Sequence, residues 1–370
     1  MLIYVFTYIM CFLVDGVYPF SNKYVRYLFK YWLYIFLCFG YMTGSDWRQY
    51  EPLYNSITDK ELSRLEYDWA FYYLCYYSRI FISDFWLWIA ILKIAYLNSF
   101  FFLAKIFTNK VYIFIGFSLE FNLLFMLIDN PLRFMVASTF MIYGICFIIR
   151  KRNYLGGSLL LISIFFHFAI LVILLLLLSV LLFRKIVYWR NVYLIIIFIS
   201  FVALGFTGDF LNYLSLGLSS ELSVLSSKLY SYLIESNDSF FSIGSLINIL
   251  MFFIVLYYKR SILDSFPKGE ILFYYTLLYF FIFRLVLILP TGFRFVLLLH
   301  TFYIASLLVI YLKQNSLFRT LLVAFFCIVI SVKISRTYQY IPYSNSIIYI
   351  ISQEHLPYSY RSNYNLDYNQ

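Results

Sequence analysis

The sequence contains few charged residues and very little histidine. Asp, Glu, Lys and Arg make up 12% of its 370 residues, and there are three histidines, at His167, His300 and His355. Because soluble domains carry about 25% charged residues, a water-soluble protein is excluded. So few histidines argue against a multi-histidine metal site, and the five scattered cysteines include no C-x-x-C pair.

The common nucleotide-binding and hydrolase motifs are also missing. The sequence has no G-x-x-x-x-G-K-[ST], no G-x-G-x-x-G, no H-E-x-x-H and no G-x-S-x-G. An enzyme built from this chain would have to use a membrane substrate that is already activated. We therefore expect no cofactor and no metal.

Hydrophobic residues dominate instead, at 63% of the chain. One crossing of a bilayer takes about 20 of them in a helix. We therefore predict an all-α polytopic membrane protein with 11 or 12 transmembrane segments. The apolar runs lie at residues 1–14, 28–42, 85–104, 111–128, 132–149, 155–183, 190–206, 242–258, 271–289, 294–312 and 317–333.

The formal net charge of +10 comes from basic clusters between these runs. We attribute it to cytoplasmic loops that face anionic lipid, rather than to nucleic-acid binding. Most clusters fall on one side only if residues 67–83 do not cross and the run 155–183 crosses twice. His167 divides that run, so we predict a broken or re-entrant helix pair around it.

This orientation predicts the domain organisation. Residues 1–334 form a single transmembrane domain, with outer loops at about 43–84 and 207–241. Residues 335–370 form a tail on the same outer face. These three stretches hold most of the acidic residues.

Three arginines lie where basic residues are not expected. Arg133, Arg284 and Arg294 are placed at the outer membrane boundary, at the depth of His167. A cation near the bilayer is costly unless it is paired, and arginine presents a planar fork that matches phosphate oxygens. The cluster therefore favours an anionic ligand. The alternative is that each arginine reaches the headgroups or pairs with a loop acid such as Asp129.

The loop after the second apolar run combines glycine, acids and aromatic residues. Asp46, Trp47 and Tyr50 suit carbohydrate binding, because aromatic faces cover apolar sugar faces and carboxylates accept hydroxyl hydrogen bonds. An interfacial aromatic belt is the alternative. Deeper in the membrane, we expect Lys93 and Glu120 to face each other as a structural ion pair rather than a proton relay.

Five segments match short motifs of one known family. Residues 44–50 resemble G-x-D-x-x-x-Y, residues 130–137 are similar to N-x-x-R-Q-x-x-A, and residues 164–169 are similar to A-x-x-F-H-x-S-A. Arg294 begins a segment that resembles R-x-x-x-Y, and residues 341–343 resemble a late P-Y element. Together they resemble the EpsG-like and Wzy-type polysaccharide polymerases over about residues 20–345. Phe134 and His300 depart from the pattern, where Gln and Tyr are usual.

The resemblance implies a glycosyltransferase with a GT-C-like architecture in the bacterial inner membrane. Its substrate would be an undecaprenyl-pyrophosphate-linked oligosaccharide, the repeat unit of an O-antigen, lipopolysaccharide or capsule, polymerised on the periplasmic face. A chain-length regulator and a flippase of the same pathway are implied as partners.

The residues then take specific roles. Arg133 and Arg294, helped by Arg284, would bind the donor pyrophosphate and stabilise charge on the leaving group. His167 or Asp46 would orient or deprotonate the acceptor hydroxyl. The sugar path would be lined by Trp47, Tyr50 and Tyr343.

Two rival functions stay open. A flippase for the same lipid-linked glycan should show repeats and cations at mid-depth, neither of which is visible in the sequence. An O-antigen ligase would share the fold and most of the chemistry. A membrane acyltransferase would instead place a catalytic His in the first helices, and this chain has none there.

Overall fold

The computed structural model describes most of the chain. The described residues are 2–17, 20–44, 46–58, 69–129, 131–186, 243–265, 269–288, 293–336 and 343–363. The predicted apolar runs within them are largely helical, although the run 28–42 ends in a two-residue strand after its helix stops at Cys38. The run 190–206 and the outer loop 207–241 lie outside the described residues.

Several helices are suited to crossing a membrane. Four are long and apolar enough within the described residues: Phe85–Phe107, Leu132–Ile149, Arg294–Lys313 and Ser316–Ser335. Shorter apolar helices of 10–17 residues accompany them, from Leu2–Gly16 to Gly269–Phe283. The predicted all-α polytopic membrane fold is confirmed.

The chain divides into two compact units. The first comprises residues 1–170 and 315–370, and the second comprises residues 171–314. The tail therefore belongs to the first unit, although the whole of the second unit lies between the two parts of the first in the sequence. The boundary at residue 334 stays a prediction.

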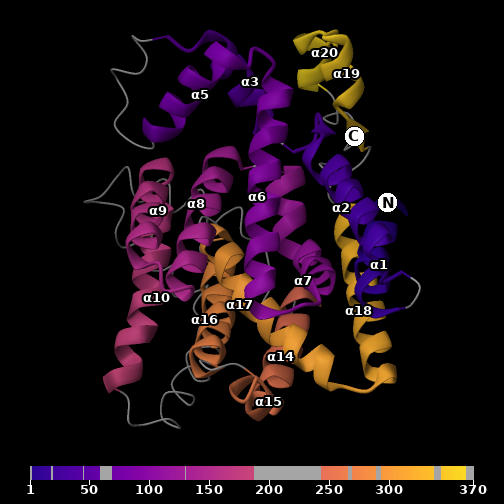
Figure 1. The fold of residues 1–370 in the computed structure, drawn as a ribbon, viewed down its shortest axis with the longest axis vertical. Helices are drawn as coiled ribbons and strands as arrows, with labels where there is room; N and C mark the ends of the chain where they lie inside the picture. The colour runs from indigo at the N-terminus through magenta and orange to yellow at the C-terminus, as the bar shows by residue number, and fades with distance from the viewer. Residues whose placement is uncertain are drawn as a thin grey trace. The chain divides into compact units, whose positions relative to one another are not determined.

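The first unit contains most of the helices (Figure 1). Two strands pair antiparallel in it, with Gly40 opposite Asn345 and Tyr41 opposite Ser344. Its elements are α1 (Leu2–Gly16), α2 (Lys23–Cys38), β1 (Gly40–Tyr41), α3 (Trp47–Ser56), α5 (Trp69–Phe81), α6 (Phe85–Phe107), α7 (Val111–Ser118), the π-helical η1 (Leu119–Leu123) and η2 (Phe125–Asp129), α8 (Leu132–Ile149), α9 (Asn153–Phe166), α18 (Ser316–Arg336), β2 (Ser344–Asn345), α19 (Ile347–Ser352) and α20 (Tyr358–Asn363).

Small residues bring α8 and α9 close together. A Cβ on Gly156 would lie 2.8 Å from the Gly144 carbonyl oxygen and 2.6 Å from Cγ1 of Ile148. A Cβ on the next residue, Gly157, would meet nothing within 4 Å. The two helices therefore pack at a backbone distance that only glycine permits at Gly156.

The helix break predicted at His167 is confirmed. Helix α9 ends at Phe166, and His167 adopts an extended backbone with φ −159° and ψ 116°. Helix α10 (Ala169–Ile186) begins two residues later. The segment predicted not to cross forms α5, whose 13 residues span about 20 Å, less than the hydrocarbon thickness.

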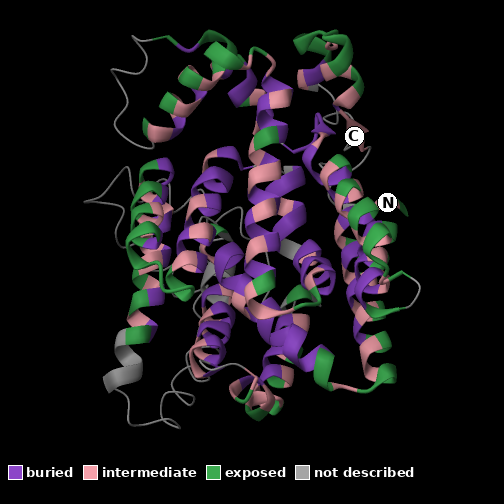
Figure 2. Ribbon diagram, in the orientation of Figure 1, coloured by how far each residue is buried: buried purple, intermediate pink, exposed green. Residues whose placement is uncertain are grey.

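The second unit is built around one helix pair. It contains α10 from Leu171 onward, α14 (Ile243–Tyr257), α15 (Lys259–Leu263), α16 (Gly269–Ile288) and α17 (Phe293–Lys313). Between α16 and α17, the Thr276 and Ser306 hydroxyls lie 2.8 Å apart and the Tyr279 and Tyr303 rings stack at 4.9 Å. Buried residues follow these two helices (Figure 2).

The expected Lys93–Glu120 pair does not form. Lys93 is fully buried, and its ammonium has no hydrogen-bond partner among the described residues. Glu120 lies in the π-helical η1, and its backbone carbonyl accepts a hydrogen bond of 3.3 Å from Lys333 Nζ. The prediction placed both residues at the same depth in two antiparallel α-helices. A π-helical turn widens the spacing and rotates the following side chains to a different face.

Candidate functional site

The turn before α3 is shaped by the glycine of the G-x-D motif. Gly44 has φ 77°, a left-handed conformation that suits glycine. Asp46 then caps α3 with its backbone carbonyl, which accepts from the Gln49 and Tyr50 amides at 3.0 and 3.1 Å. Its carboxylate makes no capping hydrogen bond. Tyr50 follows one turn later, so Asp46 and Tyr50 share a face of the helix.

Arg133 meets that face from another helix. It is the second residue of α8, and its guanidinium carbon lies 5.9 Å from the centroid of the Tyr50 ring. Tyr50 is only 6% exposed. Burial raises the pKa of Tyr50 to about 12, while the charge of Arg133 and a hydrogen bond with it oppose that shift. The phenol therefore stays neutral and helps to hold the guanidinium in place.

The position of Arg133 is informative because it works against the helix dipole. The first turn of a helix carries partial positive charge, so a cation there is unfavourable for the helix itself. The same turn presents unpaired amide N–H groups. An arginine in this position therefore adds a planar cation to a region that already attracts anions.

His167 lies beside the start of α8. Its ring contacts the Phe134 ring edge to face, with centroids 5.4 Å apart, and Phe134 directly follows Arg133. The Ala169 amide donates a 3.2 Å hydrogen bond to His167 Nδ1. Since Nδ1 accepts, the neutral ring carries its proton on Nε2, which is then a hydrogen-bond donor.

The structure thus brings together four of the predicted site residues in the first unit. Arg133, Tyr50 and Asp46 are joined by electrostatic contact, and His167 joins them through Phe134. The cluster combines a permanent cation, a neutral N–H donor and a carboxylate. These groups can bind a phosphate and can accept the proton of a hydroxyl group.

Two other predicted site residues are occupied by protein contacts. Trp47 is fully buried, and its ring is covered by Trp86 at 5.5 Å and by the Arg48 guanidinium at 4.9 Å. The Tyr343 hydroxyl donates to the Phe36 carbonyl at 2.7 Å, and its ring lies 5.0 Å from that of Phe36. Trp47 also contacts the tail, with the Tyr358 ring at 6.3 Å and the Arg361 guanidinium at 5.8 Å, so both side chains help to hold the tail in this structure.

The two remaining arginines belong to the second unit. Arg294 is exposed and is the second residue of α17, which mirrors the place of Arg133 in α8. Arg284 lies in α16, and its side chain is outside the described part of the structure. His300 is buried between the rings of Tyr279 and Tyr303, at 5.4 and 5.5 Å.

Sequence reasoning missed the contact between the tail and α3. Arg361 of α20 forms an ion pair with Glu51 of α3, and both side chains are at most 7% exposed. His355 lies 2.7 Å from the Asp84 carboxylate, the N-cap of α6. The acids of the outer loops and the basic residues of the tail were the available signal, but the sequence does not say which pairs meet.

A proline in α3 explains a further tail contact. Pro52 has no amide hydrogen, so the Arg48 carbonyl four residues earlier loses its usual helical partner. The Tyr358 hydroxyl of α20 donates to that carbonyl at 2.6 Å. Arg48 in turn donates from Nε to the Ser362 carbonyl at 2.9 Å.

These features define a class of protein, a multi-pass α-helical membrane protein. The model of the EpsG family matches residues 23–345, and the chain belongs to that family. The resemblance drawn from the motifs is confirmed, and the chain is a polysaccharide-polymerase-like membrane protein. No curated protein and no solved structure matches it.

Proposed function

We propose that this protein is a polysaccharide polymerase, a glycosyltransferase of the bacterial inner membrane. It joins undecaprenyl-pyrophosphate-linked oligosaccharide repeats of an O-antigen or capsule on the periplasmic face. Membership of the EpsG family supports the general class. The observation that carries the proposal is the contact of Arg133 with Tyr50 at the start of an apolar helix, where His167 packs against the next residue, Phe134.

In the proposed reaction, an acceptor hydroxyl attacks the anomeric carbon of the donor sugar. The bond from that carbon to the pyrophosphate oxygen breaks, and undecaprenyl pyrophosphate leaves. Arg133 binds the pyrophosphate and stabilises the charge that develops on it. Tyr50 positions the Arg133 guanidinium.

Asp46 and His167 act on the acceptor sugar. Asp46 accepts the proton of the attacking hydroxyl, because a carboxylate is a base and Asp46 shares a face of α3 with Tyr50, which contacts Arg133. His167 donates its Nε2 hydrogen to a substrate oxygen, a role favoured by the hydrogen bond that Nδ1 accepts. The assignment of Arg284 and Arg294 to the same pyrophosphate, and of a chain-length regulator and a flippase as partners, stays a prediction.

The proposal is tested in cells that lack this protein and carry a variant in its place. Arg133→Ala should leave surface glycan as single repeats, while the length ladder returns with the unaltered protein. Arg150→Ala is the matched control, since Arg150 is an exposed arginine just beyond the other end of α8. Full-length chains from a well-expressed Arg133→Ala protein would contradict the proposal. Loss of all surface repeats in the deletion strain would point to a flippase.

The role of His167 needs a separate comparison. A glutamine amide reaches the place of Nε2, whereas an asparagine amide reaches the place of Nδ1. We expect His167→Gln to retain more polymerisation than His167→Asn, at equal expression. Equal and complete loss in both would indicate that His167 is the base, and would remove the donor role.

A further inference from the structure

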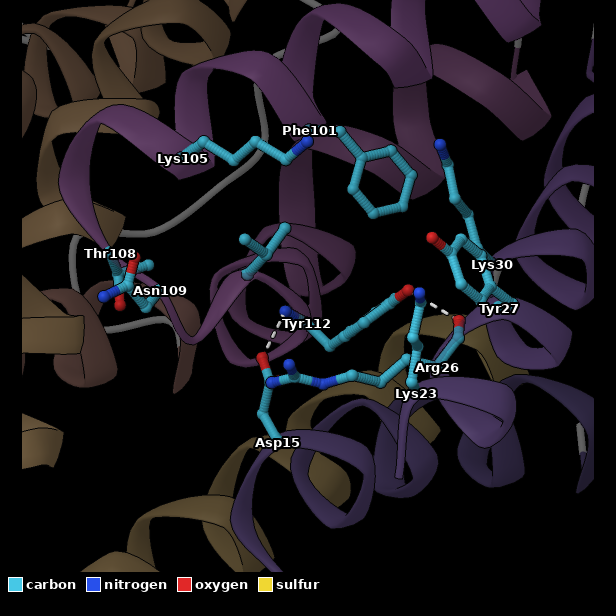
Figure 3. A pocket seen from close by; sticks show the side chains of 11 residues that line it. Asp15, Lys23, Arg26, Tyr27, Lys30, Phe101, Lys105, Thr108, Asn109 and Tyr112 are labelled. Atoms are coloured by element: carbon cyan, nitrogen blue, oxygen red, sulfur yellow. Dashed lines mark hydrogen bonds and ion pairs between the residues drawn. The ribbon is translucent and has the colours of Figure 1, made fainter. Parts of the chain in front are cut away.

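A basic hollow lies in the first unit, separate from the site described above. It has a volume of about 520 Å³ and is lined by the ends of α1 and α6 and by the starts of α2 and α7 (Figure 3). Four cations line it, Lys23, Arg26, Lys30 and Lys105, against one acid, Asp15. The formal charge of the lining is therefore 4 − 1, or +3.

The single acid is already fully engaged. Asp15 forms an ion pair with Arg26, and its other carboxylate oxygen accepts the Tyr112 amide at 2.6 Å and the Ile113 amide at 3.4 Å. Its backbone carbonyl accepts Lys110 Nζ at 2.5 Å. Asp15 thus holds the start of α7 against the end of α1 and does not neutralise the lysines.

The three lysines have no acidic partner within the described residues. Lys30 lies over aromatic rings, 5.4 Å from Tyr34 and 5.3 Å from Phe101, and Lys23 lies 5.8 Å from the Tyr27 ring. Lys105 lies in the last turn of α6. Cations gathered around one hollow repel one another, and an anion between them would relieve that repulsion.

The hollow lies at the level of a membrane boundary. Helix α6 begins beside α3, where the Phe85 and Tyr54 rings are 5.7 Å apart, and carries Lys105 in its last turn. Its 23 residues extend about 35 Å, slightly more than the hydrocarbon thickness of a bilayer. The hollow and the candidate site are therefore at opposite ends of a membrane-spanning helix.

The neighbouring surface is apolar and exposed. Lys23, Arg26 and Lys30 recur at helical spacing along α2, and Tyr24, Leu28 and Tyr31 form an adjacent exposed stripe on the same helix. A ligand with an anionic head and hydrocarbon chains would match both surfaces at once. A soluble anion would use only the basic one.

We propose that this hollow binds the headgroup of an anionic phospholipid, with the acyl chains lying along the exposed stripe of α2. Basic pockets between transmembrane helices commonly bind such headgroups. The site is independent of the polymerase activity, because it lies at the opposite end of α6 and shares no residue with the Arg133 cluster.

The test compares two double variants of the full chain. Lys30→Gln with Lys105→Gln removes two charges from the hollow, and Lys151→Gln with Arg152→Gln removes two exposed charges elsewhere in the same unit. Purified proteins are titrated with phosphatidylglycerol in phosphatidylcholine nanodiscs, and retained lipids are counted by native mass spectrometry. We expect saturable binding that is roughly 30-fold weaker in the hollow variant and unchanged in the control.

Three outcomes would overturn the proposal. Equal weakening in both variants would mean that general charge attraction explains the binding. Absence of saturable phosphatidylglycerol binding would remove the site. Displacement of the lipid by millimolar glycerol phosphate or pyrophosphate would indicate a soluble anion instead. Lys30→Arg with Lys105→Arg, which keeps both charges, should bind like the unaltered protein and shows that a loss is not caused by misfolding.

Discussion

The ion pair between the tail and α3 gives the sharpest prediction about stability. In Arg361→Met the Glu51 carboxylate, whose side chain is 7% exposed, stays buried without its cation. Breaking one side of a buried ion pair costs about 3–5 kcal/mol. The substitution also removes a guanidinium that lies within 5.9 Å of the rings of Trp47 and Trp86, so the upper part of this range is expected.

The cost should appear as local opening of the tail. At 1.4 kcal/mol per factor of ten, a cost of about 3–5 kcal/mol should raise amide hydrogen exchange in residues 344–363 by roughly 100- to 4,000-fold. Exchange is followed by mass spectrometry in detergent at constant pH. Adding Glu51→Gln to Arg361→Met removes the stranded charge and should restore part of the protection. A rise below tenfold, or no recovery in the double variant, would refute the burial argument.

Three further predictions concern helix packing, a hydrogen bond of the tail and a buried charge. Gly156→Ala should lower the free energy of unfolding by about 1–3 kcal/mol, because its Cβ would lie 2.8 Å from the Gly144 carbonyl oxygen. Gly157→Ala is the control and should not lower it, because a Cβ there meets nothing within 4 Å. Equal melting temperatures for the two variants would contradict this prediction. Tyr358→Phe should weaken tail protection by about 1 kcal/mol in hydrogen exchange. The loss should largely disappear in a Pro52→Ala background, where the new amide reaches the Arg48 carbonyl. Lys93→Met should leave thermal stability unchanged or higher, since it removes a buried ammonium that has no hydrogen-bond partner among the described residues. A clear drop in melting temperature would show that this ammonium has a favourable partner.

Features that depend on local sequence could be predicted. Apolar runs gave the positions of the helices because each run is long enough to need burial or lipid along its whole length. His167 marked a helix break because the apolar run around it is too long for one crossing. The G-x-D motif located the turn before α3, where Gly44 has a positive φ.

Features that depend on residues far apart in the sequence could not be predicted. Arg361 and Glu51 are separated by 310 residues, and nothing in either local sequence selects the other. The π-helical turns of η1 also have no clear sequence signal, yet they decide which way Glu120 faces. Trp47 suits a sugar by its chemistry, but an aromatic side chain serves equally well in a buried contact, and the local sequence does not distinguish the two; in the structure Trp47 is buried.

Helix α3 connects the tail with the candidate site. Its ten residues are too few for a stable helix in isolation, so contacts on its sides must hold it in place. Tyr50 faces Arg133, while Glu51 on the neighbouring face holds Arg361 of the tail. Loosening the tail therefore removes one of the contacts that hold α3, and with it Tyr50, in place beside Arg133. A tail variant such as Arg361→Met should consequently reduce polymerisation as well as tail protection, although Arg361 lies outside the Arg133 cluster.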